Sequence, residues 1–435
     1  MERLAYQTLI DWKTRSDRKP ILVDGARQTG KTYLVESIFG EREFRRIHKL
    51  DFLENPSLSD VFEGELHPDA LLNRIGLALG RDIDQKHDLI FFDEVGECER
   101  ALSSLKYFAE RRPDIFLCAS GSNLGLMRSF PVGKVELLEL FPMCFEEFIN
   151  ACGSPSLITA FQNQVRNSTV HNLLWGMLCD FYFVGGMPET VAAWIEPLDG
   201  INARIQRITE IQQAILAGFI RDFGKYDSHV PAFQIEAVFR NVGSQLAQYV
   251  DTSVQRYRFN DVLPGKNRYA SLRSPIAWLE KARLLWRSSL IDSRPNPPLA
   301  AIAKENLFKL FLFDIGLLGN LLGLTYTDHH KQDLTYKGFY AENFFATEYR
   351  ARVSYPMYSW QQARAEIEFL HRSQDGSVLP IEVKSGKRTR AKSLSSYIDR
   401  FHPKRALKFA NVPVRTHVGR TSTWPLYDVQ FLKDL

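Results

Sequence analysis

The sequence predicts an α/β protein in which a mostly parallel sheet comes first, then a helical region, and then a second α/β module. Two observations lead to this fold class. Up to about residue 150, short apolar runs with the length of buried strands alternate with helical patterns, as in chains of βαβ units. Beyond that point helical periodicity dominates. With 435 residues the chain is longer than a single hydrophobic core usually serves, so several domains are expected.

In the first region, strand-like runs and helical patterns alternate regularly. The runs are apolar and short enough for buried strands, and they lie at 21–23, 45–52, 89–92 and 115–119. The helical patterns lie before and between them, at 2–16, 32–39, 68–79 and 101–111. This order predicts crossover connections and a parallel sheet.

The later chain changes character twice. Helical periodicity from 172 to 221 is interrupted by Gly185-Gly186-Met187-Pro188. Two helical patterns (232–250 and 269–282) and two strand-like runs (284–291 and 307–313) then give the outline of a winged helix. The last part starts with a helix at 336–352 and continues with strands at 365–371 and 379–383, a final helix and a final strand. We therefore expect domains at 1–150, 151–230, 231–325 and 326–435.

The segment Gly25-Ala26-Arg27-Gln28-Thr29-Gly30-Lys31-Thr32 has the spacing GxxxxGK[ST] of a phosphate-binding loop, or P-loop. Glycines let backbone N–H groups turn toward phosphate oxygens, and the lysine reaches the β- and γ-phosphates. The loop joins a strand to a helix whose positive end favours the same anion. The alternative is a chance glycine turn. We expect nucleotide contacts from Gly25, Gln28, Thr29, Gly30, Lys31, Thr32 and Tyr33.

A second strand, Leu89-Ile90-Phe91-Phe92, ends in the acidic pair Asp93-Glu94. At that position Asp93 is expected to hold Mg²⁺ together with the Thr32 hydroxyl. Glu94 is expected to orient or deprotonate the attacking water. The alternative is a pair of helix-capping acids after a strand. Joined to the glycine loop, the pair predicts ATP and Mg²⁺ as cofactors, with Lys31 and Glu94 as catalytic residues.

A third strand ends in Ser120-Gly121-Ser122-Asn123. A polar side chain there, Ser122 or Asn123, is a candidate sensor of the γ-phosphate, although these residues are also the commonest turn formers. Arg128 follows closely, and it is either an arginine finger or a solvated charge. A finger supplied by another subunit would require a homo-oligomer.

In these segments the chain resembles AAA-type ATPases of bacteria and archaea that carry a C-terminal domain of unknown function. The resemblance extends over nearly the whole chain, and the order of the matching segments along the chain is specific to this group. It rests on GARQTGKT, IFFDEV, ASGSN, VELLELFPMCFEEF, FVGGMPETV, FLFDIGLLGNLL, GFYAENFFATEY and PIEVKSGK. Such relatives often carry Gly-Arg where this chain has Gly133-Lys134. The resemblance implies an AAA-type P-loop fold and ATP binding, but no pathway.

The same resemblance implies a restriction-endonuclease-like fold for the last module. The active site of that fold uses acids on a helix and two strands, followed by Glu-x-Lys, to hold Mg²⁺ at a phosphate. Glu342, Glu368, Glu382 and Lys384 are the matching residues here. Strand alternation puts Glu382 and Lys384 on one face. The alternatives are a solvated strand face or a degenerate nuclease fold kept for binding.

Charge is concentrated locally, although the net charge of +4 is mild. Residues 253–290 and 384–408 are strongly basic, and Tyr257, Phe259 and Tyr269 lie within the first cluster. Both clusters are candidate DNA contacts, and the alternative is an ordinary solvated surface. The chain contains no long apolar run and no apolar leader, and its five cysteines form no CxxC pair. We therefore expect a cytoplasmic protein with no membrane partner.

The sequence alone does not distinguish between three functions. The first is an ATPase that switches nucleic-acid binding or processing. The second is a nucleotide-gated regulator or scaffold for protein partners, with a degenerate nuclease-like domain. The third is a metal-dependent nuclease regulated by ATP, for which Glu382 and Lys384 are the discriminating residues.

Overall fold

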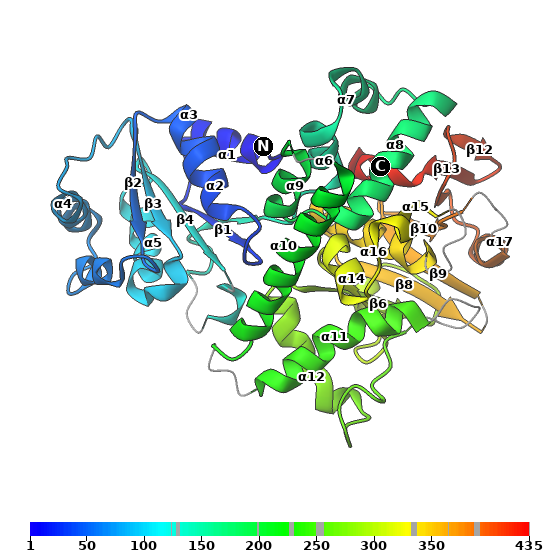
Figure 1. Ribbon diagram of the computed structural model, residues 1–435. Coiled ribbons are helices and arrows are strands. Elements are labelled where there is room, and N and C mark those ends of the chain that lie inside the picture. Colours follow the sequence, from blue (N-terminus) through cyan, green and yellow to red (C-terminus); the bar gives the residue numbers. More distant parts are fainter. Residues whose placement is uncertain are drawn as a thin grey trace. The chain divides into compact units, whose positions relative to one another are not determined.

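The computed structural model describes residues 1–122, 124–127, 131–197, 200–225, 230–248, 256–331, 337–363, 365–386 and 392–434 (Figure 1). They form two compact units. The first unit consists of Met1–Phe141 with Lys281–Arg283, and the second of Pro142–Glu280 with Leu284–Leu435. In the described ranges, no helix is both long enough and apolar enough to cross a membrane.

The first unit is built on a five-stranded sheet of order β2-β3-β4-β1-β5, in which every pairing is parallel. Its strands are β1 (Ile21–Gly25), β2 (Arg46–Asp51), β3 (Asp88–Asp93), β4 (Phe116–Ser122) and β5 (Glu136–Glu139). The predicted parallel sheet is therefore confirmed. The sequence patterns missed β5, because a four-residue edge strand with a glutamate at each end has little apolar signal.

Helices cover both faces of this sheet (Figure 1). They are α1 (Ala5–Thr14), α2 (Lys31–Tyr33), η1 (Leu34–Gly40), α3 (Glu41–Glu43), η2 (Pro56–Phe62), α4 (Pro68–Leu79), η3 (Val95–Glu97), α5 (Glu99–Arg111) and η4 (Leu124–Leu126). Strand β3 shows how the two cores form, because alternate side chains point to opposite faces. Leu89 and Phe91 pack with α1 and η1, whereas Ile90 and Phe92 pack with α4 and α5. The carboxyl ends of β1, β3 and β4 consequently meet at one edge.

The second unit contains most of the helices. They are α6 (Phe145–Cys152), α7 (Pro155–Gln162), α8 (Ser168–Val184), α9 (Pro188–Ile195), α10 (Ile201–Asp222), α11 (Ala232–Gln248), α12 (Tyr269–Lys281), α13 (Leu299–Ile302), α14 (Ile315–Leu321), α15 (Tyr326–His330), α16 (Lys337–Arg352), α17 (Lys392–Phe401) and η5 (Leu426–Asp434). The predicted break at the Gly-Gly-Met-Pro segment separates α8 from α9.

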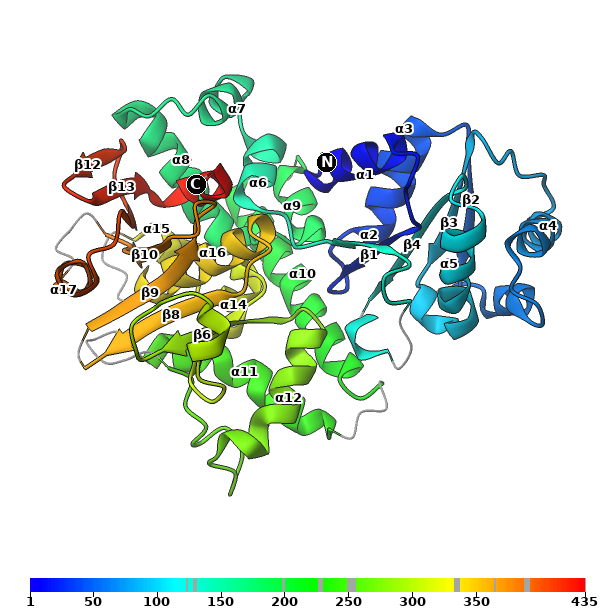
Figure 2. The same ribbon diagram turned by 180° about the vertical axis from the view of Figure 1, so that it is seen from behind.

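This unit also contains an eight-stranded sheet of order β12-β13-β11-β10-β9-β8-β6-β7. Its strands are β6 (Leu285–Ile291), β7 (Phe308–Leu312), β8 (Met357–Gln362), β9 (Ala365–Arg372), β10 (Val378–Val383), β11 (Ala406–Ala410), β12 (Thr416–Val418) and β13 (Thr421–Pro425). Figure 2 shows β6, β8 and β9 side by side. A core of aromatic and aliphatic side chains, including Trp360 and Tyr397, packs α17 against the sheet.

The predicted winged-helix outline is only partly present. Helices α11 and α12 and the antiparallel hairpin β6–β7 follow one another as expected. The hairpin is not a separate wing, however, because β6 also pairs in parallel with β8. The expected division at residue 325 thus falls within one hydrogen-bonded sheet. The sequence could not show this, since residue patterns identify strands but not the edge to which they pair. The four domain boundaries and the nuclease-like fold of the last module stay predictions.

Candidate functional site

The phosphate-binding loop lies directly after β1, where its glycines are required by geometry. A Cβ atom on Gly25 would lie 2.3 Å from the Leu140 carbonyl oxygen, so no larger residue fits. Gly30 has φ +87° and Gln28 has φ 63°, which are both left-handed conformations. Such a backbone turns its N–H groups into a concave nest suited to anions. The loop therefore fits a phosphate group, as its sequence predicts.

Lys31 is buried inside this loop. Its ammonium group donates hydrogen bonds to the carbonyl oxygens of Ala26 (2.9 Å) and Gly25 (3.2 Å) and to the Ser122 hydroxyl (2.8 Å). Burial lowers the pKa of Lys31, while the negative charge of Glu94 opposes this shift. A cation held mainly by neutral oxygens is only partly compensated, so an added anion is favoured at this position.

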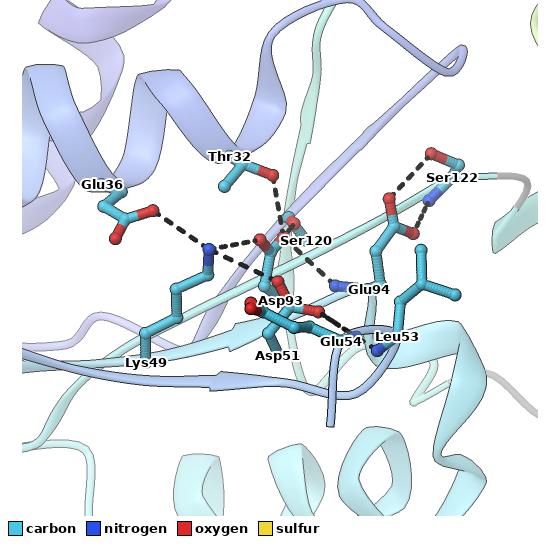
Figure 3. Close-up of polar contacts among 10 residues, drawn as sticks. All are labelled: Thr32, Glu36, Lys49, Asp51, Leu53, Glu54, Asp93, Glu94, Ser120 and Ser122. Carbon is cyan, nitrogen blue, oxygen red and sulfur yellow. Dashed lines mark hydrogen bonds and ion pairs between the residues drawn. The ribbon is translucent and has the colours of Figure 1, made fainter. Parts of the chain in front are cut away.

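Thr32 and Asp93 meet at the edge of the sheet, as predicted for a magnesium site (Figure 3). The Thr32 hydroxyl donates to Asp93 Oδ1 over 3.1 Å, and the Ser120 hydroxyl donates to the same oxygen. Asp93 is 2% exposed. A hydroxyl and a carboxylate beside a phosphate loop are oxygen ligands of the kind Mg²⁺ prefers. These residues therefore fit a magnesium ion.

Glu94 lies beside Asp93 but faces a different strand end. Its φ of 48° is left-handed, which is costly for a non-glycine residue. In this conformation its carboxylate accepts hydrogen bonds from the Ser122 N–H (3.3 Å) and hydroxyl (3.4 Å). Ser122 thus contacts both Lys31 and Glu94, and its role as a sensor stays a prediction. Asn123 and Arg128 lie outside the described residues.

Lys49, which the sequence did not single out, joins Asp93 to two further acids. Lys49 on β2 places its ammonium nitrogen 3.1 Å from Glu36 Oε2, 3.4 Å from Asp51 Oδ2 and 3.3 Å from Asp93 Oδ2 (Figure 3). Burial alone would lower the pKa of Lys49, but the hydrogen bond to Glu36 and the charge of Asp93 outweigh it and raise the pKa. No motif signals these contacts, because they join residues of three separate elements.

Arg3 is a second cation that the sequence did not identify. It is 6% exposed, and its guanidinium donates to the carbonyl oxygens of Thr29 (2.8 Å) and Phe141 (2.7 Å). One side chain thus ties the phosphate-binding loop to the segment that follows β5. Bonds from side chains to backbone carbonyls leave no sequence pattern by which Arg3 could have been found.

Arg283 was counted in the first basic cluster, and the structure shows it in ion pairs. Its guanidinium nitrogens lie 3.1 Å from Asp24 Oδ2 and 3.1 Å from Glu139 Oε1. Asp24 is 3% exposed and is the residue before Gly25. Arg283 is therefore engaged at the end of β1 and is not a freely solvated charge.

The predicted nuclease-like residues come together in the second unit. Lys384 lies 3.2 Å from Glu368 Oε1 and 2.8 Å from Glu382 Oε1. The Oε2 atoms of both glutamates are buried and have no hydrogen-bond partner among the described residues. Burial raises the pKa of Glu368 to about 8. Glu342, from α16, also acts on Glu368 through its charge.

A lysine that the sequence did not single out completes this cluster. Lys309 on β7 is 2% exposed and lies 3.1 Å from Glu342 Oε2 and 2.5 Å from Glu366 Oε1. Burial also raises the pKa of Glu342. Among the described residues, no group of three histidine, cysteine or acidic side chains has the arrangement needed to hold a metal ion. The structure thus brings Glu342, Glu368, Glu382 and Lys384 together, but as acids neutralised by lysines.

The three aromatic residues of the first basic cluster pack around one phenylalanine. Tyr257 is 6% exposed, and Tyr257, Phe259 and Tyr269 pack around Phe308, with ring centroids 5.7–6.1 Å from it. Arg287 pairs with Glu280 at 2.7 Å. Other basic side chains of the two clusters are exposed: Arg256, Arg258, Arg268, Arg273, Lys281, Lys392, Arg400, Lys404 and Arg405. Lys387, Arg388 and Arg390 lie outside the described residues.

Comparison with protein families agrees with this geometry. Residues 17–149 match the family described as an AAA domain. Residues 177–328 match a domain of unknown function, DUF8612, and residues 337–423 match another, DUF4143. The chain therefore carries an AAA-type P-loop domain. The later matches name no function.

Solved structures add only weak likenesses. PCH-2 of C. elegans has 13% sequence identity and a TM-score of 0.27, and the match covers 48% of this chain and 66% of that one. This chain thus spans just under two thirds of PCH-2. Drosophila ORC, in a structure bound to DNA, has 12% identity and a TM-score of 0.26, with 73% and 84% covered. No curated protein matches the chain. Likenesses of this strength carry no conclusion about substrate or partner.

Proposed function

We propose that the chain hydrolyses ATP at the P-loop and uses its nucleotide state to switch the binding or processing of nucleic acid. One observation carries the ATPase proposal. Lys31, Thr32, Asp93 and Glu94 converge at the carboxyl ends of β1 and β3, with Ser122 contacting two of them. Phosphoryl transfer needs a cation in the phosphate-binding loop, a hydroxyl and a carboxylate that hold the metal, and a second carboxylate that acts on the attacking water.

Each residue has a distinct role in this proposal. The loop N–H groups and Lys31 bind the phosphates and neutralise their charge. Thr32 and Asp93 hold Mg²⁺, which supplies further neutralisation of the transferred group. Glu94 orients and deprotonates the attacking water, and Ser122 keeps its carboxylate near Lys31.

Two substitutions test this site. Lys31→Ala is expected to abolish nucleotide binding, because the loop loses its only buried ammonium group. Glu94→Gln is expected to keep binding but to reduce turnover by about 10²- to 10⁴-fold, since the amide cannot accept a proton. Fluorescent-nucleotide titration and phosphate release measure the two effects. Glu97→Gln, at an exposed glutamate nearby, is the matched control. Equal turnover by Glu94→Gln and wild type would exclude Glu94 as the base.

The nucleic-acid part of the proposal rests on the exposed basic side chains, such as Arg268 and Arg405. Phosphate contacts of this kind make binding strongly dependent on salt. We therefore expect double-stranded DNA to raise the ATP turnover of the wild type, and the effect to fade as salt increases. Lys31→Ala serves as the blank. Turnover that is indifferent to DNA at low salt would overturn this part alone.

A nucleotide-gated regulator of protein partners is the second candidate. The packing of Tyr257 against Phe308 and the ion pairs of Arg283 and Arg287 favour it, because they remove groups that would otherwise contact bases and phosphates. This reading predicts ATP turnover that does not respond to DNA.

Nuclease activity at Glu382 and Lys384 is the third candidate. Lys309 argues against it, since an ammonium group already neutralises Glu342, which a metal would need. If the chain cleaves DNA when Mg²⁺ is present, Lys384→Ala is expected to abolish the cleavage. Cleavage that persists in this variant would not come from the cluster.

A further inference from the structure

Lys49 stands out because no motif includes it, although it contacts the carboxylate that is expected to serve the magnesium ion. We propose that Lys49 is a positioning residue: it holds Asp93 when magnesium is absent, and leaves it for Glu36 and Asp51 when magnesium binds with the nucleotide. The inference rests on the proposed ATP site. It adds a device that couples binding of the metal to binding of the nucleotide.

The geometry divides the Asp93 carboxylate between two sets of groups. Oδ1 accepts from the hydroxyls of Thr32 and Ser120 and from the Glu94 N–H, the last over 3.2 Å. Oδ2 faces the Lys49 ammonium at 3.3 Å. Asp93 is 2% exposed, so these groups cover nearly all of its carboxylate. A metal ion that approaches Asp93 must therefore displace one of these groups.

Lys49 is the group that electrostatics selects for displacement. A divalent cation and an ammonium group on one carboxylate repel each other, and the carboxylate of Asp93 itself is buried. The hydroxyl of Thr32, by contrast, can turn its oxygen toward a metal and remain in place.

The two remaining acids keep Lys49 paired after it moves. Glu36 lies at 3.1 Å from its ammonium nitrogen and Asp51 at 3.4 Å, so a shift of the flexible lysine stem loses one partner and retains two. Glu36 belongs to η1, which continues the helix of the P-loop, and Asp51 ends β2. The displaced ammonium therefore stays beside the site.

This arrangement predicts that magnesium alone binds poorly, because it must displace Lys49 without help from phosphate oxygens. Removing the competing cation should reverse this. In Lys49→Met we expect a lower melting temperature in EDTA, because three acids lose a shared partner. We also expect MgCl₂ without nucleotide to raise that temperature by roughly 2–4 °C. Wild type should not respond to MgCl₂ alone.

Lys13→Met is the matched control. Lys13 also pairs with a glutamate, Glu43, at 3.0 Å, and its side chain is 27% exposed against 25% for Lys49. We expect no response of this control to MgCl₂. An equal response of wild type, or none in a folded Lys49→Met, would overturn the proposal.

A second variant tests the idea without removing the lysine. Asp51 Oδ1 accepts from the N–H groups of Leu53 (3.1 Å) and Glu54 (3.0 Å), and an asparagine keeps this acceptor. Asp51→Asn therefore removes mainly the charge that receives Lys49. We expect the magnesium concentration needed for half-maximal binding of a fluorescent ATP analogue to rise about 5- to 10-fold. An unchanged or lower requirement would overturn the proposal.

The two measurements also separate this proposal from the ATP site. If wild type binds no nucleotide, the proposed function fails, but the melting experiment with MgCl₂ alone still tests Lys49. If nucleotide binds and neither variant changes the response to magnesium, only the role of Lys49 fails.

Discussion

At the residue scale, three buried or half-buried lysines show how differently one side chain can be compensated. Lys31 is held mainly by neutral oxygens, Lys49 by three acids and Lys309 by two glutamates. A cation among neutral oxygens favours an incoming anion, whereas one among carboxylates already has its counter-charge. This difference supports Lys31 as a ligand-binding residue and Lys309 as a structural one.

Arg3 holds the backbone of the phosphate-binding loop at Thr29. In a trans peptide the C=O and the following N–H point in opposite directions. By holding the Thr29 carbonyl, Arg3 therefore directs the Gly30 N–H away from itself, toward the concave side of the loop. We expect Arg3→Gln to weaken nucleotide binding by roughly tenfold, or ~1.4 kcal/mol. Titration with a fluorescent ATP analogue measures this effect.

The control for Arg3→Gln is Arg42→Gln. This variant also removes one positive charge from the first unit, but its ion pair with Glu2 lies at the surface. If both variants bind nucleotide as wild type does, Arg3 has no part in shaping the loop.

At the element scale, one aspartate connects two motifs that are far apart in sequence. Asp314 caps α14 by accepting from the Leu317 N–H at 2.8 Å, and its other oxygen accepts from the Gly186 N–H at 2.7 Å. Gly185 has φ +74°, and a Cβ atom there would lie 2.5 Å from the Asp314 carboxylate. The glycines after α8 are thus explained by close packing in the second unit, and no ligand is needed.

Asp314→Ala should therefore destabilise the second unit. The change removes a helix cap and leaves two N–H groups without partners, which costs about 2–4 kcal/mol. Denaturant unfolding followed by circular dichroism measures the loss. Asp328→Ala removes a cap from the exposed start of α15, and it should cost only about 1 kcal/mol. Equal losses of stability in the two variants would contradict the view that a buried cap stabilises the fold more than an exposed one.

Local sequence patterns identified most elements of the first unit but not the contacts between elements. Alternating apolar runs and helical patterns predicted β1 to β4 and their helices, because local spacing decides these elements. The sequence singled out Lys31 and Thr32 through the spacing of a motif, and Asp93 and Glu94 through their place at the end of an apolar strand. Lys49 and Arg3 were not singled out, since their partners come from other elements and from backbone atoms. The sheet that joins β6 to β8 was missed for the same reason.

At the scale of the whole molecule, buried histidines make stability depend on pH. Burial lowers the pKa of His371 to about 4, and its ring accepts or donates a hydrogen bond with the Tyr349 hydroxyl at 3.1 Å. The folded pKa lies below the unfolded value of about 6.5. This histidine therefore stabilises the fold above about pH 6.5, and that stability is lost as the pH falls toward 4.

His371→Asn should reduce this pH dependence. The asparagine keeps a polar atom near Tyr349 but does not titrate. Between about pH 7 and about pH 5, wild type should lose roughly 2 kcal/mol more stability than the variant. Denaturant midpoints at both pH values measure the difference. His417→Asn, at an exposed histidine on β12, should behave like wild type. Parallel pH profiles for wild type and His371→Asn would contradict this account.

The pairing of β6 with β8 has a mechanical consequence. Hinges in proteins are loop or terminal residues that absorb large backbone rotations, and a hydrogen-bonded ladder cannot rotate in that way. The hairpin β6–β7 and strands β8 to β13 belong to one hydrogen-bonded sheet. They can therefore separate only if hydrogen bonds between neighbouring strands break. A hinge at residue 325 that separated the hairpin from strands β8 to β13 would therefore have to break the pairing of β6 with β8.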